Sequence, residues 1–572
     1  MKILTPLAGD TSRKTDKIAT FDIESHDWKK YAYGAHYNGL EVRYFEGMKD
    51  LLDFMLQDKF RDWKQFAHYG GRFDFLFLLD AIQHTGLKFK PLAIGAKLAE
   101  LKIEKPNNRG HYWYFRDSST QLGDSLARLT QSFGVTEKLQ GAIDFDAGER
   151  FDFRNSLHRE YLRRDVVGLY EVIKAYQSHE AVQAGGLKLT IASQGMDFFR
   201  RGMKEPLIQS PDSVQNFVRE SYVGGRCELF KFSGDQISVY DINSMYPYVM
   251  RHKTLPMEYI GQSSDWREFG FHKCRIKMPE TYIPPLPSKI SGKLYFPIGN
   301  FEGTYFSEEL KLASSLGAEI ELIEGHQFSQ SDHFFKNYID YWWNERQKHP
   351  SGTARNYIAK LFMNSLYGKF GQKEEMIKTI SVSELKNQNF EPFINEEISE
   401  KLGLVNLRKR HRSPFMLVHL AAAITSWSRI HLYRYILHNE KSVYYCDTDS
   451  LFTSHRYPSG IHLGDLKIEY DKVRFEGRGA KHYMIETDTD KIMKAKGFPK
   501  KFIKTLSEAE FLRGAMNYSE EKLLTFKRAL ISNGEILSTG QIRKSVRNEY
   551  LKRKRLPNGE TAPWKIYNNR LI

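Results

Sequence analysis

The chain has 572 residues, 41% of them hydrophobic and 14% aromatic, and its formal net charge is +15. This length can bury more than one hydrophobic core, so we expect about two to four domains. The excess of Lys and Arg favours a polyanionic partner, and three cysteines without paired spacing argue against a disulfide framework or a zinc site. No apolar run approaches a membrane span and the first residues lack a signal-peptide core, so we expect an intracellular protein with no membrane partner. We also expect a monomer.

The first part of the chain, about 190 residues long, alternates between predicted strands and helices, which is typical of an α/β module. Its expected strands are residues 18–24, 31–35 and 64–68. Its expected helices are residues 48–57, 73–82 and 157–178. A loop with two glycines at 184–186 marks the expected boundary to the rest of the chain.

Four carboxylates of this module are placed where they can converge. Asp22 and Glu24 are two residues apart on the first strand, so their side chains point to one face. Asp74 opens a helix, and Tyr161 and Asp165 lie one helical turn apart. Each is a commonplace surface residue when taken alone. Together, four carboxylates and a tyrosine fit a two-metal site that hydrolyses a phosphodiester.

The larger second part of the chain carries three further carboxylates at strand ends. An apolar strand delivers Asp241, and a second strand leads into a tight turn with Asp447 and Asp449 on the same side. Two like charges so close suggest a divalent cation with oxygen ligands between them. Taken alone, a solvated turn explains the pair at 447 and 449 better, and a turn or helix cap explains Asp241 better. Together the three carboxylates fit a two-metal site for phosphoryl transfer.

A predicted helix between these strands places Lys360, Asn364 and Tyr367 on one face. A cation, an amide and an aromatic ring suit a triphosphate, a sugar–base edge and a stacked base. On spacing alone, an amphipathic helix with a snorkelling lysine is the better explanation.

The end of the chain is strongly basic. Lysine and arginine concentrate at 494–504 and 543–555, and we expect helices at 508–516 and 520–530 between them. Basic side chains such as Lys552 and Arg553 would grip duplex phosphates, although a merely solvated charged surface is about equally good for any one residue.

Three segments of the second part carry a family resemblance. Residues 241–247, 360–368 and 445–450 read DINSMYP, KLFMNSLYG and YCDTDS, and in this order they resemble motifs A, B and C of family B DNA polymerases. The resemblance implies a mixed α/β chain with a right-hand polymerase of palm, fingers and thumb. It also implies two Mg²⁺ or Mn²⁺ ions per active site. In the polymerase site Asp241 and Asp449 would hold them, with Asp447 a neighbouring carboxylate and the Ile242 carbonyl a further ligand.

The same resemblance assigns contacts to the incoming nucleotide. Tyr246 would lie under the deoxyribose and exclude a 2′-hydroxyl. Lys360 would meet the phosphates, with Lys348 as a second phosphate contact, and the other two residues of the helical face would shape the nascent base pair.

Shorter motifs resemble the family's DNA contacts. Tyr222, Gly224 and Gly225 match the Tyr-x-Gly-Gly linker that grips template and coordinates the two activities. The segment from Thr425 to Arg429 is similar to a primer-contacting motif, and Lys481 with Tyr483 matches the Lys-x-Tyr motif that steadies the primer terminus.

The N-terminal carboxylates and Tyr161 resemble the motifs of a DnaQ-like, ribonuclease-H-like 3′–5′ exonuclease, and Ser125 fits the accompanying motif that holds single-stranded DNA. Two positions depart from the family. Tyr69 stands where the family has asparagine, and Gln140 stands where it has lysine, with Lys138 close by but out of register. Because all the carboxylates remain, we expect hydrolysis to survive but to be weakened.

The compact length, the room between motifs A and B and the charged stretch at 371–412 resemble the protein-primed subgroup of bacteriophages and linear plasmids. This implies DNA template and primer, dNTPs and a terminal protein as partners, in the cytoplasm of an infected bacterium, or in an organelle or cytoplasm for a linear plasmid. The expected domains are 1–190 (exonuclease), 191–260 (start of the palm), 261–330 (first terminal-protein-region insertion), 331–370 (fingers), 371–413 (second insertion, for strand displacement and processivity), 414–495 (palm) and 496–572 (thumb).

Two other classes of function compete with a DNA polymerase. A reverse transcriptase or RNA polymerase also uses carboxylates on strands, but Tyr246 argues against ribonucleotides and the adjoining exonuclease motifs argue against reverse transcription. A non-catalytic DNA-binding scaffold would have lost at least one metal carboxylate, and none is lost.

Overall fold

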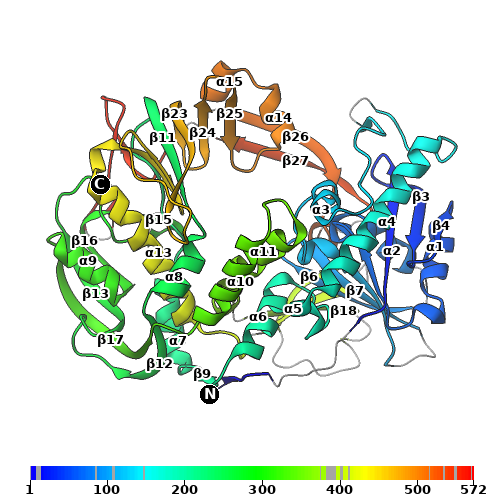
Figure 1. The fold of residues 1–572 in the computed structure, drawn as a ribbon, viewed down its shortest axis with the longest axis horizontal. Helices are drawn as coiled ribbons and strands as arrows, with labels where there is room; N and C mark the ends of the chain where they lie inside the picture. The colour runs from blue at the N-terminus through cyan, green and yellow to red at the C-terminus, as the bar shows by residue number, and fades with distance from the viewer. Residues whose placement is uncertain are drawn as a thin grey trace.

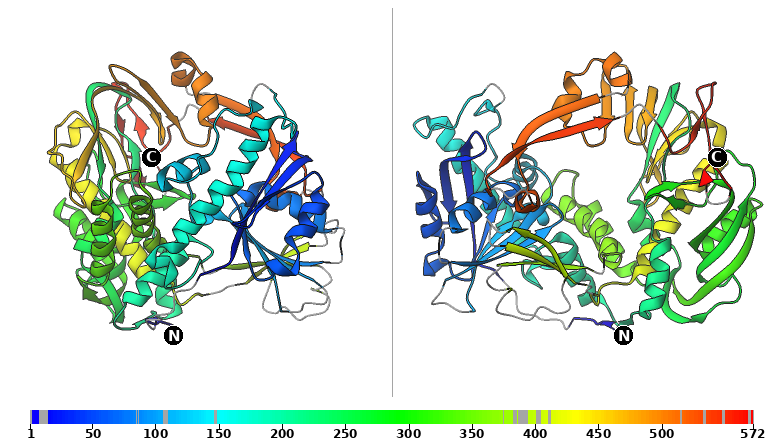
Figure 2. Two further views of the ribbon diagram at one scale, coloured as in Figure 1. Left: turned by 45° about the vertical axis from the view of Figure 1, so that its right-hand side comes forward. Right: turned by 180° about the vertical axis from the view of Figure 1, so that it is seen from behind.

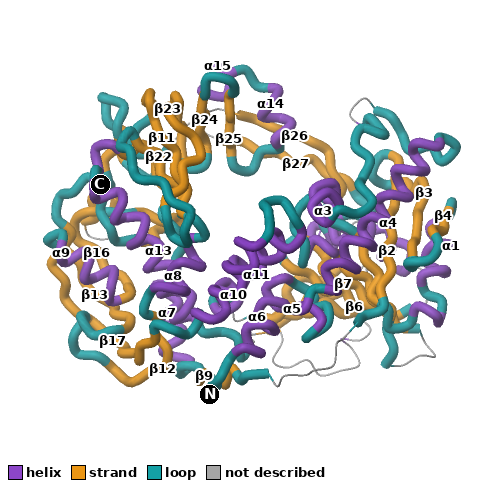
Figure 3. Tube along the Cα trace, in the orientation of Figure 1, coloured by secondary structure: helices purple, strands orange, loops and turns teal. Residues whose placement is uncertain are grey.

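A computed structural model describes residues 2–571 apart from 8–14, 84, 86, 106–109, 146–147, 374, 382–384, 386–393, 400–403, 410–411, 514–515, 532–534, 547–549 and 568–569. The chain folds into two lobes that helices join below and a long β-hairpin joins above (Figures 1 and 3). Among the described residues, no helix combines the length and apolarity needed to cross a membrane.

The N-terminal lobe is built on a seven-stranded mixed sheet in the order β4-β3-β2-β5-β8-β7-β6. β2 pairs with β3 as an antiparallel hairpin and with β5 in parallel, so β2 lies inside the sheet. The strands are β2 (Ile18–His26), β3 (Lys30–Tyr37), β4 (Val42–Phe45), β5 (Lys64–Ala67), β6 (Lys88–Ile94), β7 (Lys97–Glu104) and β8 (Trp113–Asp117). The helices are α1 (Met48–Met55), α2 (Asp74–Gln83), α3 (Leu126–Phe133), α4 (Ser156–Ser178) and α5 (Glu180–Gln183).

The second lobe contains another seven-stranded sheet, in the order β10-β21-β22-β11-β23-β24-β25. The expected hairpin around the 447–449 turn is β21 and β22, and β22 lies beside β11, the expected strand with Asp241. The strands are β10 (Cys227–Leu229), β11 (Ser233–Ile242), β21 (Val443–Asp447), β22 (Ser450–Thr453), β23 (Leu466–Gly479), β24 (His482–Glu486) and β25 (Lys491–Ala495).

A six-stranded sheet lies beside this one, in the order β12-β17-β13-β16-β30-β31. Its strands are β12 (Leu255–Gln262), β13 (Gly270–Met278), β16 (Ile298–Phe306), β17 (Glu319–Ser331), β30 (Lys565–Tyr567) and β31 (Arg570–Leu571), and α9 (Ser307–Ser315) follows β16. Because its last two strands come from the C-terminal end, the expected thumb at 496–572 does not form one unit.

Helices connect the lobes and share one buried core. They are α6 (Ile191–Gly202), α7 (Asp212–Ser221), α8 (Met245–His252), α10 (Lys336–Lys348), α11 (Ala354–Phe370) and α13 (Val418–His438). One hydrophobic cluster runs from Tyr176 on α4 to Trp342 on α10 and Phe362 on α11. The lobes are therefore held together by apolar packing as well as by the chain.

The charged stretch after α11 forms a small three-stranded sheet in the order β18 (Met376–Ser381), β20 (Leu404–Lys409), β19 (Ile394–Ser399). Three further two-stranded pairs are β1 (Ile3–Leu4) with β9 (Leu207–Ile208), β14 (Ser288–Ile290) with β15 (Lys293–Tyr295), and β28 (Lys554–Arg555) with β29 (Thr561–Ala562).

The basic end contains the antiparallel hairpin β26 (Met516–Leu523) and β27 (Thr539–Val546), with α14 (Lys500–Thr505), α15 (Glu508–Arg513) and α16 (Phe526–Ile531). The helix expected over 520–530 is therefore wrong in its first part, because Glu520–Leu523 pair with β27. The hairpin crosses from the second lobe to the first, drawn in orange in both views of Figure 2. At its far end Phe526 and Ile536 are buried in the core of the N-terminal lobe.

Arg553 does not lie on a phosphate-gripping surface. Its side chain is fully buried and donates to Thr561 Oγ1 at 2.8 Å and to the Tyr282 carbonyl at 2.6 Å, with Glu228 as its ionic partner at 4.0 Å. Lys552 donates to the Cys227 carbonyl at 3.0 Å. The expectation that Arg553 grips DNA is wrong, because it fastens the C-terminal segment to the base of β10.

Candidate active sites

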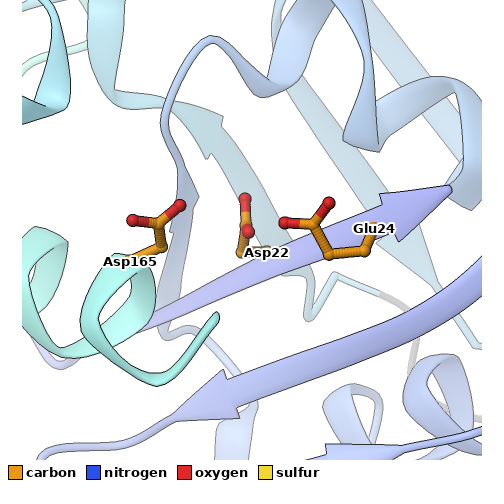
Figure 4. A group of neighbouring side chains, drawn as sticks. All are labelled: Asp22, Glu24 and Asp165. Atoms are coloured by element: carbon orange, nitrogen blue, oxygen red, sulfur yellow. The ribbon is translucent and has the colours of Figure 1, made fainter. Parts of the chain in front are cut away.

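The structure brings the predicted N-terminal carboxylates together. Asp22 and Glu24 project from β2 toward Asp165 on α4, and oxygens of the three side chains lie within 4.8 Å of one another (Figure 4). Asp74, the first residue of α2, joins them through its Oδ1, which accepts a 3.0 Å hydrogen bond from the backbone N–H of Ile23. The alternation of β2 thus places two carboxylates on the face that α4 covers.

Burial and like charge dominate the electrostatics of this cluster. Burial, followed by the charge of Asp165, raises the pKa of Glu24 to about 8. Burial raises the pKa of Asp74 to about 7, and burial with the charges of Asp74 and Asp165 raises the pKa of Asp22 well above its usual range. Asp165 also has a raised pKa because it is buried. Such a cluster is unstable as four anions and calls for cations.

One cation is already present. Lys138 Nζ donates to Tyr161 Oη at 2.9 Å and also binds Asp165 Oδ2. Although burial alone would lower the pKa of Lys138, the charge of Asp165 holds that pKa above its ordinary value. Gln140 is exposed. The cluster thus contains a lysine, Lys138, which lies two residues upstream of Gln140 and binds Tyr161 and Asp165.

The other position that departs from the family pattern is Tyr69, which stands where the family has asparagine. Tyr69 has a left-handed backbone, with φ of 57°, and its hydroxyl donates to the Gly123 carbonyl at 2.8 Å. Its ring is 39% exposed at the rim of the lobe. The structure therefore supplies a phenol, and not an amide, at this position. Ser125, expected to hold DNA, is exposed and caps the N-terminus of α3.

Asp117 is a fifth carboxylate near this cluster, and it was not predicted from the sequence. Asp117 ends β8, which lies parallel to β5, and its side chain is buried with Oδ2 lacking a hydrogen-bond partner in the part of the chain described. Its charge contributes to the raised pKa of Asp74, and Lys97 Nζ lies 3.7 Å from Oδ2. The sequence feature that could have identified Asp117 is its position at the carboxyl end of an apolar strand, next to the strand that leads to His68.

The second site lies where β11 meets the β21–β22 turn. The backbone N–H of Ile242 donates to the Asp449 carbonyl at 2.8 Å, and Ser450 pairs with Asp241 in the strand register. Ser450 Oγ lies 3.4 Å from Asp241 Oδ1. Thr448 takes a left-handed conformation, with φ of 62°, which makes the turn tight. The predicted carboxylates are thus adjacent.

Asp447 differs from the other two carboxylates of this site. It binds Lys481 Nζ and accepts from Tyr445 Oη at 3.3 Å. Burial, then the charges of Asp449 and Glu469, raises the pKa of Asp241 to about 7, and burial also raises the pKa of Asp449. Glu469, exposed on β23, is a carboxylate that the sequence reasoning missed. Among the described residues neither Asp241 nor Asp449 forms an ion pair, so these two are better placed than Asp447 to bind a divalent ion.

The Tyr-x-Gly-Gly segment lies directly on this turn. The Thr448 N–H donates to the Arg226 carbonyl at 2.7 Å. A Cβ on Gly225 would lie 2.8 Å from the Thr448 side chain, so only glycine allows this approach. Tyr222 packs its ring against Gly371 after α11, and Gly224 is exposed.

Two residues expected to contact primer are interior. Arg429 is 5% exposed and forms a two-point ion pair with Glu309, at 2.8 and 3.1 Å. It also donates to the carbonyls of Val223 and Gly224, at 2.9 and 3.1 Å. Thr425 is 3% exposed. Their direct primer contact is not supported, because the Arg429 side chain instead holds the linker loop.

The face of α11 on which nucleotide contacts are predicted borders a cavity. Lys360 and Asn364 are exposed, and with Gly123 and Asp124 of the N-terminal lobe they line a cavity of about 640 Å³. The rings of Tyr246 and Tyr367 stack at 4.4 Å and 29°. This face therefore runs from the cavity to the second carboxylate site.

Two further predicted contacts are less favourably placed. Lys348, at the end of α10, is bound to Glu345 at 2.8 Å. Tyr483 is 8% exposed in the palm-side core, against Tyr445 and Phe452.

Both clusters fit divalent cations. Their donors are carboxylate oxygens, which suit hard ions such as Mg²⁺ and Mn²⁺. In the N-terminal cluster Asp165 Oδ1 is buried and has no hydrogen-bond partner among the residues that the structure covers, so it is free to accept an ion.

The chain is similar to known DNA polymerases in sequence and in fold. The family described as DNA polymerase type B, organellar and viral, matches residues 152–406. A probable DNA polymerase of Neurospora intermedia is 28% identical over 543 residues, covering 78% of this chain and 55% of that protein. The DNA-directed DNA polymerase of Enterobacteria phage PRD1 is 27% identical over 506 residues, covering 81% and 82%. The chain is thus similar in sequence to organellar and viral type B DNA polymerases, and residues 152–406 carry the family match.

The chain spans about half the length of the fungal relatives, 55% of the Neurospora protein and 47% of a probable DNA polymerase of Podospora anserina. Among solved structures it is similar to Phi29 DNA polymerase complexed with single-stranded DNA, with a TM-score of 0.72, 18% identity, and coverage of 93% of this chain and 100% of that one. Phi29 DNA polymerase with primer-template DNA and incoming nucleotide gives 0.72 at 17% identity, covering 94% and 100%. The predicted fold class, a right-hand polymerase with an exonuclease domain, is confirmed.

The raised pKa values predict how pH and metal affect stability. The folded chain retains a proton on Glu24 that the unfolded chain loses above 4.5, so this stabilisation is complete below that pH and is lost as pH rises through about 8. In EDTA the unfolding temperature should therefore fall across this window. Added Mg²⁺ should reverse the fall, because it binds the deprotonated carboxylates. Thermal unfolding measured with EDTA and with Mg²⁺ tests this, and Glu24→Gln should make the EDTA curve shallower; an EDTA curve that rises with pH would contradict it.

Proposed function

We propose that this chain is a DNA-directed DNA polymerase with a separate 3′–5′ exonuclease centre. The observation that carries the proposal is the neighbouring pair Asp241 and Asp449, whose charges interact, with the stacked Tyr246 and Tyr367 and the exposed Lys360 on the adjoining helix face. The polymerase names of the relatives and the DNA-bound Phi29 structures support it.

Each side chain of the polymerase centre has a definite task in this proposal. Asp241, Asp449 and the Ile242 carbonyl would hold two divalent ions, which when bound lower the barrier by activating the attacking oxygen and stabilising developing charge. Lys360 attracts the triphosphate, and Asn364 and Tyr367 border the new base pair. The Tyr246 ring, fixed by its stack on Tyr367, leaves no room for a 2′-hydroxyl.

We also propose which elements form the palm, fingers and thumb of the polymerase. The β11–β21–β22 sheet is the palm, α10 and α11 are the fingers, and the β26–β27 hairpin with α14 and α15 is the thumb. The β12–β17 sheet and the β18–β20 sheet are the two insertions of a protein-primed polymerase. Because both ends of the thumb hairpin are anchored, one to each lobe, duplex held beneath it leaves slowly, which suits processive, strand-displacing synthesis.

The exonuclease centre would use Asp22, Glu24, Asp74 and Asp165 to hold metal ions for phosphodiester hydrolysis. Lys138 keeps the Tyr161 hydroxyl and Asp165 oriented toward the scissile phosphate. Since this lysine is in place, only Tyr69 remains as a reason for weaker binding of the primer end.

Primer extension tests the polymerase. With Mg²⁺ the chain should add deoxynucleotides much faster than ribonucleotides. Asp241→Asn and Asp449→Asn should each lower the rate on the order of 10²–10³-fold, because transition-state charge loses its support. Asp488→Asn removes an exposed palm carboxylate and should change little. Equal rates for Asp449→Asn and the unaltered chain would refute the assignment.

Excision of a mismatched 3′ end tests the exonuclease. Lys138→Ala should slow excision by about 10–100-fold, the usual cost of losing a partner that orients metal ligands. Gln140→Ala is the matched control from the same loop and should leave the rate nearly unaltered. The reverse ranking of these two variants would show that Lys138 has not taken the family lysine's place.

Protein priming has its own test. Terminal protein, origin DNA and one labelled dNTP should yield a covalent protein–nucleotide adduct that Asp241→Asn abolishes, since both primers share the polymerase centre. If a cognate terminal protein gives no adduct while DNA primers are extended, the chain is a general family B polymerase.

A further inference from the structure

A tryptophan occupies an unfavourable turn position beside the exonuclease carboxylates. β2 and β3 are joined by a turn in which Asp27 and Trp28 have φ values of 52° and 65°. The Lys29 N–H closes the turn by donating to the His26 carbonyl at 3.3 Å. Two successive left-handed residues are the signature of a type I′ turn, whose second position favours glycine. A bulky residue there costs stability.

Burial does not explain the tryptophan. The ring of Trp28 is 48% exposed, so only part of it covers other atoms. Its described ring contact is with Phe73, edge-on at 6.2 Å and 81°. The turn itself is braced from outside, because Arg150 binds both carboxylate oxygens of Asp27, at 3.1 and 3.2 Å. The fold thus holds a large aromatic face in place without hiding it.

The position of this ring relates it to the catalytic carboxylates. Phe73 directly precedes Asp74, and Glu24 lies two residues before the end of β2, about 7 Å along the strand. Arg72, next to Phe73, is exposed and supplies a cation on the same rim. Exposed aromatic rings beside a cation are common in sites that bind single-stranded nucleic acid, because every base has a face that can stack.

We propose that Trp28 is a stacking platform for a base of the single-stranded 3′ end, next to the nucleotide that the carboxylates cleave. This inference rests on the exonuclease proposed above. Trp28 touches the strand away from the scissile phosphate, so it contributes to binding rather than to the chemical step. Removing it should therefore raise KM for single-stranded DNA and leave kcat nearly unchanged.

Trp28→Gly separates this role from a structural one. Glycine fits the left-handed backbone better, so the unfolding temperature should stay the same or rise while KM for single-stranded DNA rises about fivefold or more. Trp28→Phe should restore most of the affinity. Leu40→Ala, at an exposed apolar residue between β3 and β4 of the same lobe, is the matched control and should alter neither quantity. Primer extension on a paired end should be equal in all four proteins.

Unchanged KM in Trp28→Gly would overturn the proposal, and so would a lowered unfolding temperature accompanied by a falling kcat, which indicates a structural role. Binding of a fluorescent single-stranded oligonucleotide in Ca²⁺, followed by anisotropy, decides the matter independently of hydrolysis. If the unaltered chain binds the oligonucleotide more tightly than Trp28→Gly but does not shorten it in Mg²⁺, the platform stands and the exonuclease proposal fails. Equal binding by both proteins overturns the platform.

Discussion

The architecture depends on one electrostatic constraint, which is the cost of gathering carboxylates away from water. Both sites gather acids, and burial with the charge of a neighbouring acid raises the pKa of Glu24 in one site and of Asp241 in the other. Lysines offset part of the cost, with Lys138 bound to Asp165 in the first site and Lys481 bound to Asp447 in the second. The remaining acids stay short of positive charge, and that deficit favours divalent cations there.

The scaffold keeps these acids together through backbone hydrogen bonds and buried ion pairs. Ile23 and Ile242 each donate a backbone N–H to an aspartate of the cluster beside them. Arg429 and Glu309 lock the linker loop against the palm turn, and Arg553 fixes the C-terminal segment beneath β10. A buried charge that loses its partner is costly, so these arginines make the geometry of the polymerase site sensitive to distant parts of the chain.

Much of the fold and of both sites followed from the sequence, because strand alternation and helical spacing are local. Asp22 with Glu24, and the face of Lys360, are examples. The predictions that failed concern residues whose neighbours depend on the path of the chain in three dimensions. Motif register could not show that Lys138 reaches Asp165 while Gln140 faces solvent, and composition could not tell buried Arg553 from the basic residues around it. The expected helix over 520–530 gave way to strand pairing, because a partner strand outweighs local propensity.

In the proposed polymerase, the anchored β26–β27 hairpin would limit how DNA can be loaded. Phe526 and Ile536, between β26 and β27, are buried in the N-terminal core, so the hairpin forms an arch that is held at both ends. A linear duplex could pass beneath such an arch by its free end. A covalently closed circle has no end to offer and could enter only after the tip unpacked. The proposed polymerase would therefore favour templates that have a free end.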